Sequence, residues 1–254
     1  MDNEKLFFPV KESNKSRVIG KLRYIRGMSA AALMFIFVAL PAMAIAKIFR
    51  RPNILYPLCD WGAKVWIWAC GAKVETFGKE NLEAGKSYIF VANHRSYLDT
   101  ATMFSFTGRQ LGFVAKKELA KVPIVGWVMP FVNILAIDRS NPQKAVETMN
   151  AMQKVLDEGL SIGIFAEGTR ARDGELLPFK KGAFHLAMQT GTAIVPVAIK
   201  NTDYLMGKKK GIANAGTISL HLLKPIETKG LNIETDLETL MIRTRNAVAE
   251  ELGK

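Results

Sequence analysis

His94 and Asp99, five positions apart, are the pair of residues in this sequence best suited to general-base chemistry. A carboxylate that accepts one ring N–H of a histidine fixes its tautomer and leaves the other nitrogen as a base. Residues five apart on one helix point in different directions, so the two meet only if His94 precedes a helix and Asp99 lies in its first turn. Ser96 suits the N-cap, which makes Asp99 the third helical residue. Ser96-x-x-Asp99 also matches a capping box, so Asp99 could instead serve only to begin the helix.

A second polar group, Glu167-Gly168-Thr169-Arg170, follows another apolar run. Glycine permits close approach of the backbone to a ligand, and the arginine fork fits a phosphate. The alternative is a salt-bridged surface turn. Lys116 and the pair Asp138-Arg139 also follow apolar runs, but alone they are typical of a solvated charge and of an ion pair.

Short apolar runs alternate with longer amphipathic segments, and this alternation predicts an α/β domain. The runs predict these strands: Ala72–Phe77, Tyr88–Ala92, Leu111–Ala115, Asn133–Ile137, Ser161–Ala166, Ala193–Lys200 and Thr217–Lys224. The longer segments predict helices over Tyr97–Phe106, from Pro142 to an end at Gly159, over Pro178–Gln189 and over Glu234–Glu251. Since open α/β sheets bind ligands at the carboxyl ends of their strands, His94 lies where such a sheet would place a ligand.

The N-terminal quarter of the chain is typical of a membrane anchor. A basic segment, residues 1–23, precedes a stretch from Gly27 to Ala46 that has 20 residues and no charge. As a helix this stretch would be roughly 30 Å long, enough to cross a bilayer, although Pro41 should kink it. Three of the four tryptophans follow, at positions 61, 66 and 68, and basic residues flank the stretch on both sides.

These features predict that residues 24–71 form a helical hairpin that enters one leaflet, with both ends on the same side. A plain membrane span is the alternative, and a cleaved signal peptide is a third interpretation. Residues 72–254 would then form the α/β domain.

Composition limits the partners. The chain of 254 residues has a net charge of +12, which suits phosphate-bearing small molecules, anionic lipid or nucleic acid. No motif of a nucleic-acid-binding domain is present, so nucleic acid is not expected. Cys59 and Cys70 form neither a disulfide framework nor a metal motif, which is consistent with a reducing compartment.

Asn93-His94-x-x-x-x-Asp99 resembles the first motif of the glycerolipid acyltransferases, and three further motifs follow in order. Asn133–Arg139 is similar to the family's Gly-x-x-x-Ile-Asp-Arg, with Asn133 in place of glycine. Phe165–Arg170 is similar to Phe-Pro-Glu-Gly-Thr-Arg, with Ala166 in place of proline. Ile194–Ile199 matches an apolar strand that contains a proline. The resemblance covers roughly residues 74–200.

The resemblance implies a single mixed sheet flanked by helices and an O-acyltransferase activity. The expected reaction joins an acyl chain from acyl-CoA or acyl carrier protein to the sn-2 hydroxyl of 1-acylglycerol 3-phosphate, which gives phosphatidic acid. His94 and Asp99 would be catalytic. The implied substrate-binding residues are Lys116, Arg139, Glu167, Gly168, Thr169 and Arg170. No tightly bound cofactor or metal is implied, and the expected location is the cytoplasmic face of a membrane, the bacterial inner membrane.

Several alternatives stay open at this point. The acceptor could be another lysolipid, such as a lyso-ornithine lipid, or the chain could bind lipid without catalysis. Gly159-x-Ser161-x-Gly163 fits the serine-hydrolase elbow, although its predicted helix and strand come in the reverse order. The apolar segment Val122–Val132 could line an acyl-chain groove, contact the membrane or pack in the core. The basic loop Lys208–Lys210 could touch anionic lipid or be solvated.

Overall fold

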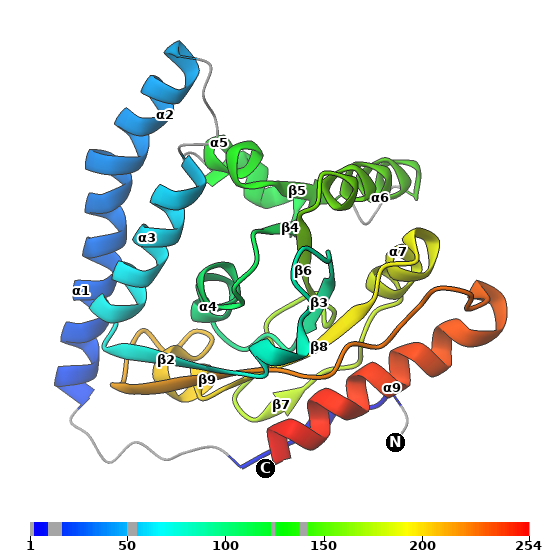
Figure 1. The fold of residues 1–254 in the computed structure, drawn as a ribbon. Helices are drawn as coiled ribbons and strands as arrows, with labels where there is room; N and C mark the ends of the chain where they lie inside the picture. The colour runs from blue at the N-terminus through cyan, green and yellow to red at the C-terminus, as the bar shows by residue number, and fades with distance from the viewer. Residues whose placement is uncertain (1–2, 10–16, 50–54, 123–124, 138–141, 254) are drawn as a thin grey trace.

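The computed structural model of the chain describes residues 3–9, 17–49, 55–122, 125–137 and 142–253, which form an α/β domain and a long N-terminal helix beside it (Figure 1). The motif residues Asp138 and Arg139 lie outside these ranges.

A seven-stranded sheet runs through the domain in the order β2-β9-β8-β3-β6-β4-β5. Its strands are β2 Ala72–Phe77, β3 Ile89–Ala92, β4 Leu111–Lys116, β5 Ile134–Ile137, β6 Ser161–Phe165, β8 Ile194–Lys200 and β9 Gly216–Leu222. Of the neighbouring pairs, only β8 and β9 are antiparallel, so the sheet is mixed. The predicted strands are confirmed to within one or two residues at each end.

The central strand β3 is buried on both faces, and its alternate residues enter two separate cores. Phe90 and Ala92 pack toward α3 (Leu55–Ala69) and α4 (Leu98–Phe106). Ile89 and Val91 pack on the opposite side, where the helices are α6 (Pro142–Asp157), α7 (Gly182–Thr190) and α9 (Ile233–Gly253). This arrangement explains why β3 is a continuous apolar run and not an alternating one.

The N-terminal helix is continuous from Arg17 to Ile48, and by length and composition it is apolar enough to cross a membrane. It consists of α1 (Arg17–Met34), a π turn (Phe35–Ala39) and α2 (Leu40–Ile48). The π turn lies just before Pro41, where the backbone N–H of Leu40 bonds to the carbonyl of Phe35. A wider turn removes the clash that proline causes in a regular helix, so a π turn accommodates Pro41 within the continuous helix. Helix α3 packs against α1, as a hairpin requires, although the first helix begins at Arg17 and not at residue 24; its entry into one leaflet stays a prediction.

Some elements were not predicted, and all of them are short. They comprise α8 (Thr202–Met206), the helical turns Lys79–Asn81, Lys117–Lys121, α5 (Val125–Val128) and Met129–Val132, and a two-stranded sheet of β1 (Leu6–Phe7) and β7 (Glu175–Leu176). The predicted helix over Pro178–Gln189 begins only at Gly182.

The segment that contains β1 packs across the loop that follows β6. The Asn3 side chain exchanges two hydrogen bonds with the backbone of Phe179, at 2.9 and 2.8 Å, and Lys5 Nζ lies 2.6 Å from Glu175 Oε1. Although this segment precedes the hairpin in sequence, it therefore holds part of the α/β domain in place.

Candidate active site

Three loops that carry predicted site residues begin at one edge of the sheet. The parallel strands β3 and β6 end in register, with Ala92 opposite Phe165, and β4 runs parallel to β6 and ends at Lys116. The sheet therefore brings together the loop that contains His94, the loop that contains Glu167 and the end of β4. This edge is where an α/β sheet binds its ligands.

His94 and Asp99 are in contact, as the spacing predicted. His94 Nδ1 lies 2.8 Å from Asp99 Oδ2, and the same oxygen accepts the backbone N–H groups of Arg95 (2.6 Å) and Ser96 (2.7 Å). Asp99 is fully buried, whereas the His94 side chain is 17% exposed. The His94 ring stacks on Phe165, with centroids 4.0 Å apart. Since the carboxylate accepts the Nδ1 proton, Nε2 is left as the basic nitrogen.

Asp99 both caps helix α4 and binds the histidine. Its bond to the Ser96 backbone N–H is one half of a capping box. The prediction that Ser96 is the N-cap is wrong, because α4 begins at Leu98 and its N-cap is Tyr97. Ser96 Oγ accepts the Leu98 N–H at 3.2 Å and donates to the carbonyl of Met206 at 2.7 Å. Ser96 thus fixes the turn to α8 as well as to α4.

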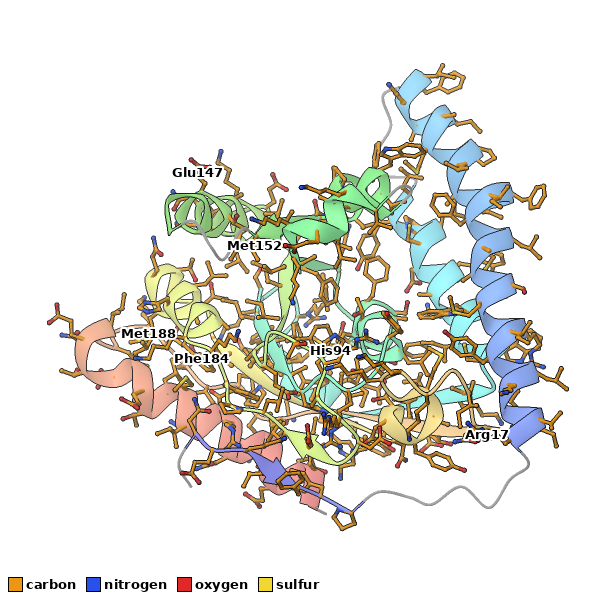
Figure 2. All side chains as sticks on the ribbon, turned by 180° about the vertical axis from the view of Figure 1, so that it is seen from behind. Arg17, His94, Glu147, Met152, Phe184 and Met188 are labelled. Carbon is orange, nitrogen blue, oxygen red and sulfur yellow. The ribbon has the colours of Figure 1, made fainter. Side chains whose placement is uncertain are left out.

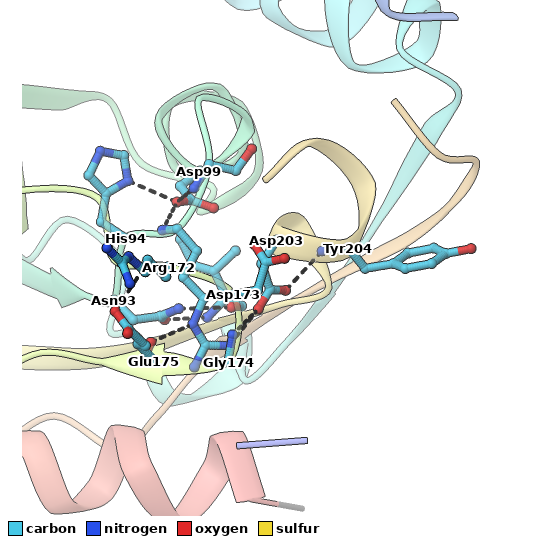
Figure 3. A network of polar contacts seen from close by, with 12 residues as sticks. Asn93, His94, Asp99, Arg172, Asp173, Gly174, Glu175, Asp203 and Tyr204 are labelled. Atoms are coloured by element: carbon cyan, nitrogen blue, oxygen red, sulfur yellow. Dashed lines mark hydrogen bonds and ion pairs between the residues drawn. The ribbon is translucent and has the colours of Figure 1, made fainter. Parts of the chain in front are cut away.

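Arg95 joins the His94 loop to two other loops, those that carry Glu175 and Asp203, which Figure 3 labels. It is 5% exposed, and its Nε donates to the carbonyl of Glu175 at 2.8 Å. Its Nη1 lies 3.2 Å from Asp203 Oδ2, which also accepts the Gly174 N–H at 2.9 Å. The buried ion pair therefore joins the loop after β3 to the segment after β8, and the hydrogen bonds to Gly174 and Glu175 join both to the loop after β6. Sequence reasoning missed Arg95 and Asp203, although their positions just after apolar strands were a usable signal.

Glu167 lies behind His94 and supports its backbone. Oε1 accepts the His94 N–H at 2.6 Å and Oε2 accepts the Leu177 N–H at 2.8 Å, and the residue is 2% exposed. Burial raises the pKa of Glu167 to about 8, although the two backbone N–H groups and the charge of Arg95 act in the opposite direction. Both oxygens bind backbone, so this structure gives Glu167 a positioning role, and its contact with a substrate stays a prediction.

The predicted binding residues lie at the surface of the same edge. Gly168 has φ of 72°, a conformation that suits glycine, and Thr169 is exposed. The Arg170 guanidinium lies 3.6 Å from the centre of the Tyr97 ring, which is a cation–π contact that the sequence did not predict. Lys116 is exposed at the end of β4. Arg139, the remaining predicted phosphate ligand, is outside the described residues.

Ser161 does not have the geometry of a serine-hydrolase nucleophile. Ser161 opens β6 at the edge opposite His94, is 2% exposed and accepts the Tyr88 N–H at 3.1 Å. It follows a helix and begins a strand, so it is not a nucleophile elbow. Within the described ranges, no cluster of three or more His, Cys, Asp or Glu side chains could hold a metal ion.

The sequence of this chain is similar to those of known acyltransferases. A family model described as acyltransferase matches residues 73–200. The 1-acyl-sn-glycerol-3-phosphate acyltransferase of Limnanthes douglasii is 30% identical over 92% of this chain and 80% of that protein. The enzyme of the same name from Saccharomyces cerevisiae is 42% identical, over 63% of this chain and 54% of that protein.

The fold also matches a solved structure. The crystal structure of the 1-acyl-sn-glycerophosphate acyltransferase PlsC from Thermotoga maritima gives a TM-score of 0.77 over 94% of this chain and 98% of that chain, at 24% identity. The present chain spans about half the length of several curated relatives that it matches.

Proposed function

Because the chain belongs to the acyltransferase family, we propose that it transfers an acyl chain from acyl-CoA or acyl carrier protein to the sn-2 hydroxyl of 1-acylglycerol 3-phosphate. The product would be phosphatidic acid. The observation that carries the proposal is the contact between His94 and the buried Asp99, at the sheet edge where Lys116 and Arg170 also lie. The acceptor is the one for which the relatives from Saccharomyces cerevisiae and Limnanthes douglasii are named.

The proposed mechanism is direct transfer. His94 Nε2 removes the proton of the acceptor hydroxyl as its oxygen attacks the thioester carbonyl. A carbon–oxygen bond forms, the carbon–sulfur bond breaks, and the imidazolium returns the proton to the departing thiolate. Asp99 keeps the ring in orientation and stabilises the imidazolium by its charge.

The binding side of the proposal assigns the acceptor phosphate to Arg170 and Lys116, with Arg139 as a further candidate. Arg170 presents a planar fork of N–H donors, and Tyr97 holds the plane of that fork by the cation–π contact. Glycine at position 168 lets a phosphate approach the backbone, and Thr169 offers a hydroxyl beside it.

We further propose that the hairpin of α1, α2 and α3 anchors the chain in one leaflet at the cytoplasmic face of a membrane, the bacterial inner membrane. In Figure 2, apolar side chains along the N-terminal helix point away from the protein. The most apolar part of this helix has no buried residue, so a lipid environment would cover what the protein leaves exposed.

One experiment tests the reaction. The detergent-purified chain and a His94→Ala variant are incubated with labelled acyl-CoA or acyl carrier protein and a panel of lysolipids, and the products are identified. Phosphatidic acid should form only with the unmodified chain, while His94→Ala still binds the acceptor. A different acylated lysolipid would change the acceptor, and free fatty acid that depends on Ser161 would replace transfer by hydrolysis.

A further inference from the structure

The segment that follows β4 exposes apolar side chains beside the site. Leu119, Val122 and Trp127 are 42%, 44% and 59% exposed, and we call these three residues the α5 patch. Single exposed apolar residues are common on soluble proteins. Here one of them is a tryptophan, and all three fall within nine positions of one another. The patch begins three residues after Lys116, which closes β4 at the site edge.

The α5 patch adjoins the apolar hairpin. Val128, the last residue of α5, lines an apolar groove of about 220 Å³ together with Val38, Met43 and Leu58 of the hairpin. Figures 1 and 2 show α5 beside the start of α3, at the end of the molecule where α2 lies. In both views α2 extends further from the domain than α5 does.

The composition of the segment favours an anionic lipid surface as the partner. Lysines at 116, 117 and 121 and one glutamate at 118 give it a net charge of +2. Tryptophan prefers the membrane–water interface, and basic residues near an anionic surface add to the attraction. A partner protein would match the apolar residues equally well, but it would not account for the continuity with the hairpin.

We propose that the α5 patch is a second membrane contact, which lies at head-group depth while α2 enters the acyl region. This inference rests on the proposed membrane anchoring. The hairpin and the α5 patch would then contact the same membrane surface next to each other, and we call the area that they cover the membrane footprint. Lys116, at the edge of that footprint, would then meet an acceptor phosphate at the membrane surface, so the lysolipid need not leave the bilayer to reach His94.

Quenching of tryptophan fluorescence by brominated lipid tests the contact directly. The full chain, Trp127→Phe and Trp68→Phe are reconstituted in vesicles of phosphatidylcholine and phosphatidylglycerol, with and without bromine near the carbonyl end of the acyl chains. Trp68 is the matched control: it is 70% exposed, but it lies at the other end of α3, near Arg26. Trp127→Phe should lose about a third of the quenched signal, and Trp68→Phe should lose none, because tryptophan at the interface is within reach of bromine.

Equal loss in the two variants, or no loss in Trp127→Phe, would overturn the proposal. Shielding of Trp127 from acrylamide by self-association without lipid would assign the patch to a second copy of the chain instead.

A second measurement uses Leu119→Ser together with Trp127→Ser. Transfer to an acceptor embedded in vesicles should fall about tenfold while transfer in detergent micelles is unchanged, because only the vesicle requires docking. An equal fall in both would indicate a structural defect. If the quenching appears but no acceptor is ever acylated, the membrane contact stands and the proposed function fails.

Discussion

The loop after β3 and residues 168–170 of the loop after β6 meet at one sheet edge, but the side chains that matter differ in burial. In the first, Asn93, Ser96 and Asp99 are fully buried and Arg95 nearly so. In the second, Thr169 is exposed and Arg170 is held by an aromatic ring that is itself 56% exposed. Buried contacts thus fix the residues around His94, whereas Thr169 and Arg170 stay accessible to a ligand. A fixed catalytic group needs no reorganisation when the substrate arrives.

The largest expected effect comes from Asp99→Asn in the loop after β3, which we call the fixed region. This change removes the negative charge beside His94. The asparagine oxygen can still accept from His94, Arg95 and Ser96, and its amide replaces an oxygen that accepts no bond within the described part of the chain. The value of kcat should fall about 100- to 1000-fold because the imidazolium loses its counter-charge. Steady-state kinetics with a urea-unfolding control separate this from capping alone, which would lower stability slightly and leave kcat near normal.

Arg170→Ala tests residues 168–170 of the loop after β6, which we call the open region. Loss of a charge-assisted contact to phosphate should lower kcat/KM for the acceptor about 10- to 100-fold, mostly through KM. Arg170→Lys is the matched variant, because it keeps the charge and loses the fork, and its value should fall between the two. If acceptor KM and kcat are both unchanged in Arg170→Ala, the phosphate binds elsewhere.

A smaller effect on kcat is expected for the pair of Arg95 and Asp203, which holds the His94 loop without touching His94. Asp203→Asn weakens the buried pair with Arg95 while His94 keeps its bonds to Asp99 and Glu167. We expect kcat to fall by less than about tenfold through misplacement of the His94 loop, with KM little changed. The stability should fall by about 1–3 kcal/mol.

Asp173→Asn is the control for that variant. Its carboxylate, in the loop after β6, pairs with Lys210 in the segment after α8, both side chains are about 30% exposed, and exposed pairs of this kind contribute about 1 kcal/mol or less. Equal losses of kcat in Asp203→Asn and Asp173→Asn would show that the Arg95 pair has no special part in positioning the histidine.

The same contrast explains what the sequence could predict. Strand β3 lies where its apolar run predicted it, because a strand that is buried on both faces is apolar at every position. The contact between His94 and Asp99 followed from spacing within one turn. The pair of Arg95 and Asp203 joins residues 108 positions apart, and Asn3 binds Phe179 across 176 positions. Single polar residues that meet at such separations leave no periodic pattern, so only the fold reveals them.

The last prediction concerns stability and not turnover, and it involves Glu167, the carboxyl group that holds the backbone of His94. Its pKa is about 8 in the folded protein against an ordinary 4.5, so the folded chain binds more protons than the unfolded chain between these pH values. The free energy of unfolding should therefore fall as the pH rises from about 4.5 to about 8, and this contribution should be constant above pH 8. Glu167→Gln does not titrate, so its slope should be smaller by up to about 1.4 kcal/mol per pH unit. Urea unfolding at pH 5 and pH 8, with the exposed Glu158→Gln as control, measures the difference. Parallel pH profiles for the unmodified chain and Glu167→Gln would mean that Glu167 is charged throughout this range, stabilised by the N–H groups of His94 and Leu177.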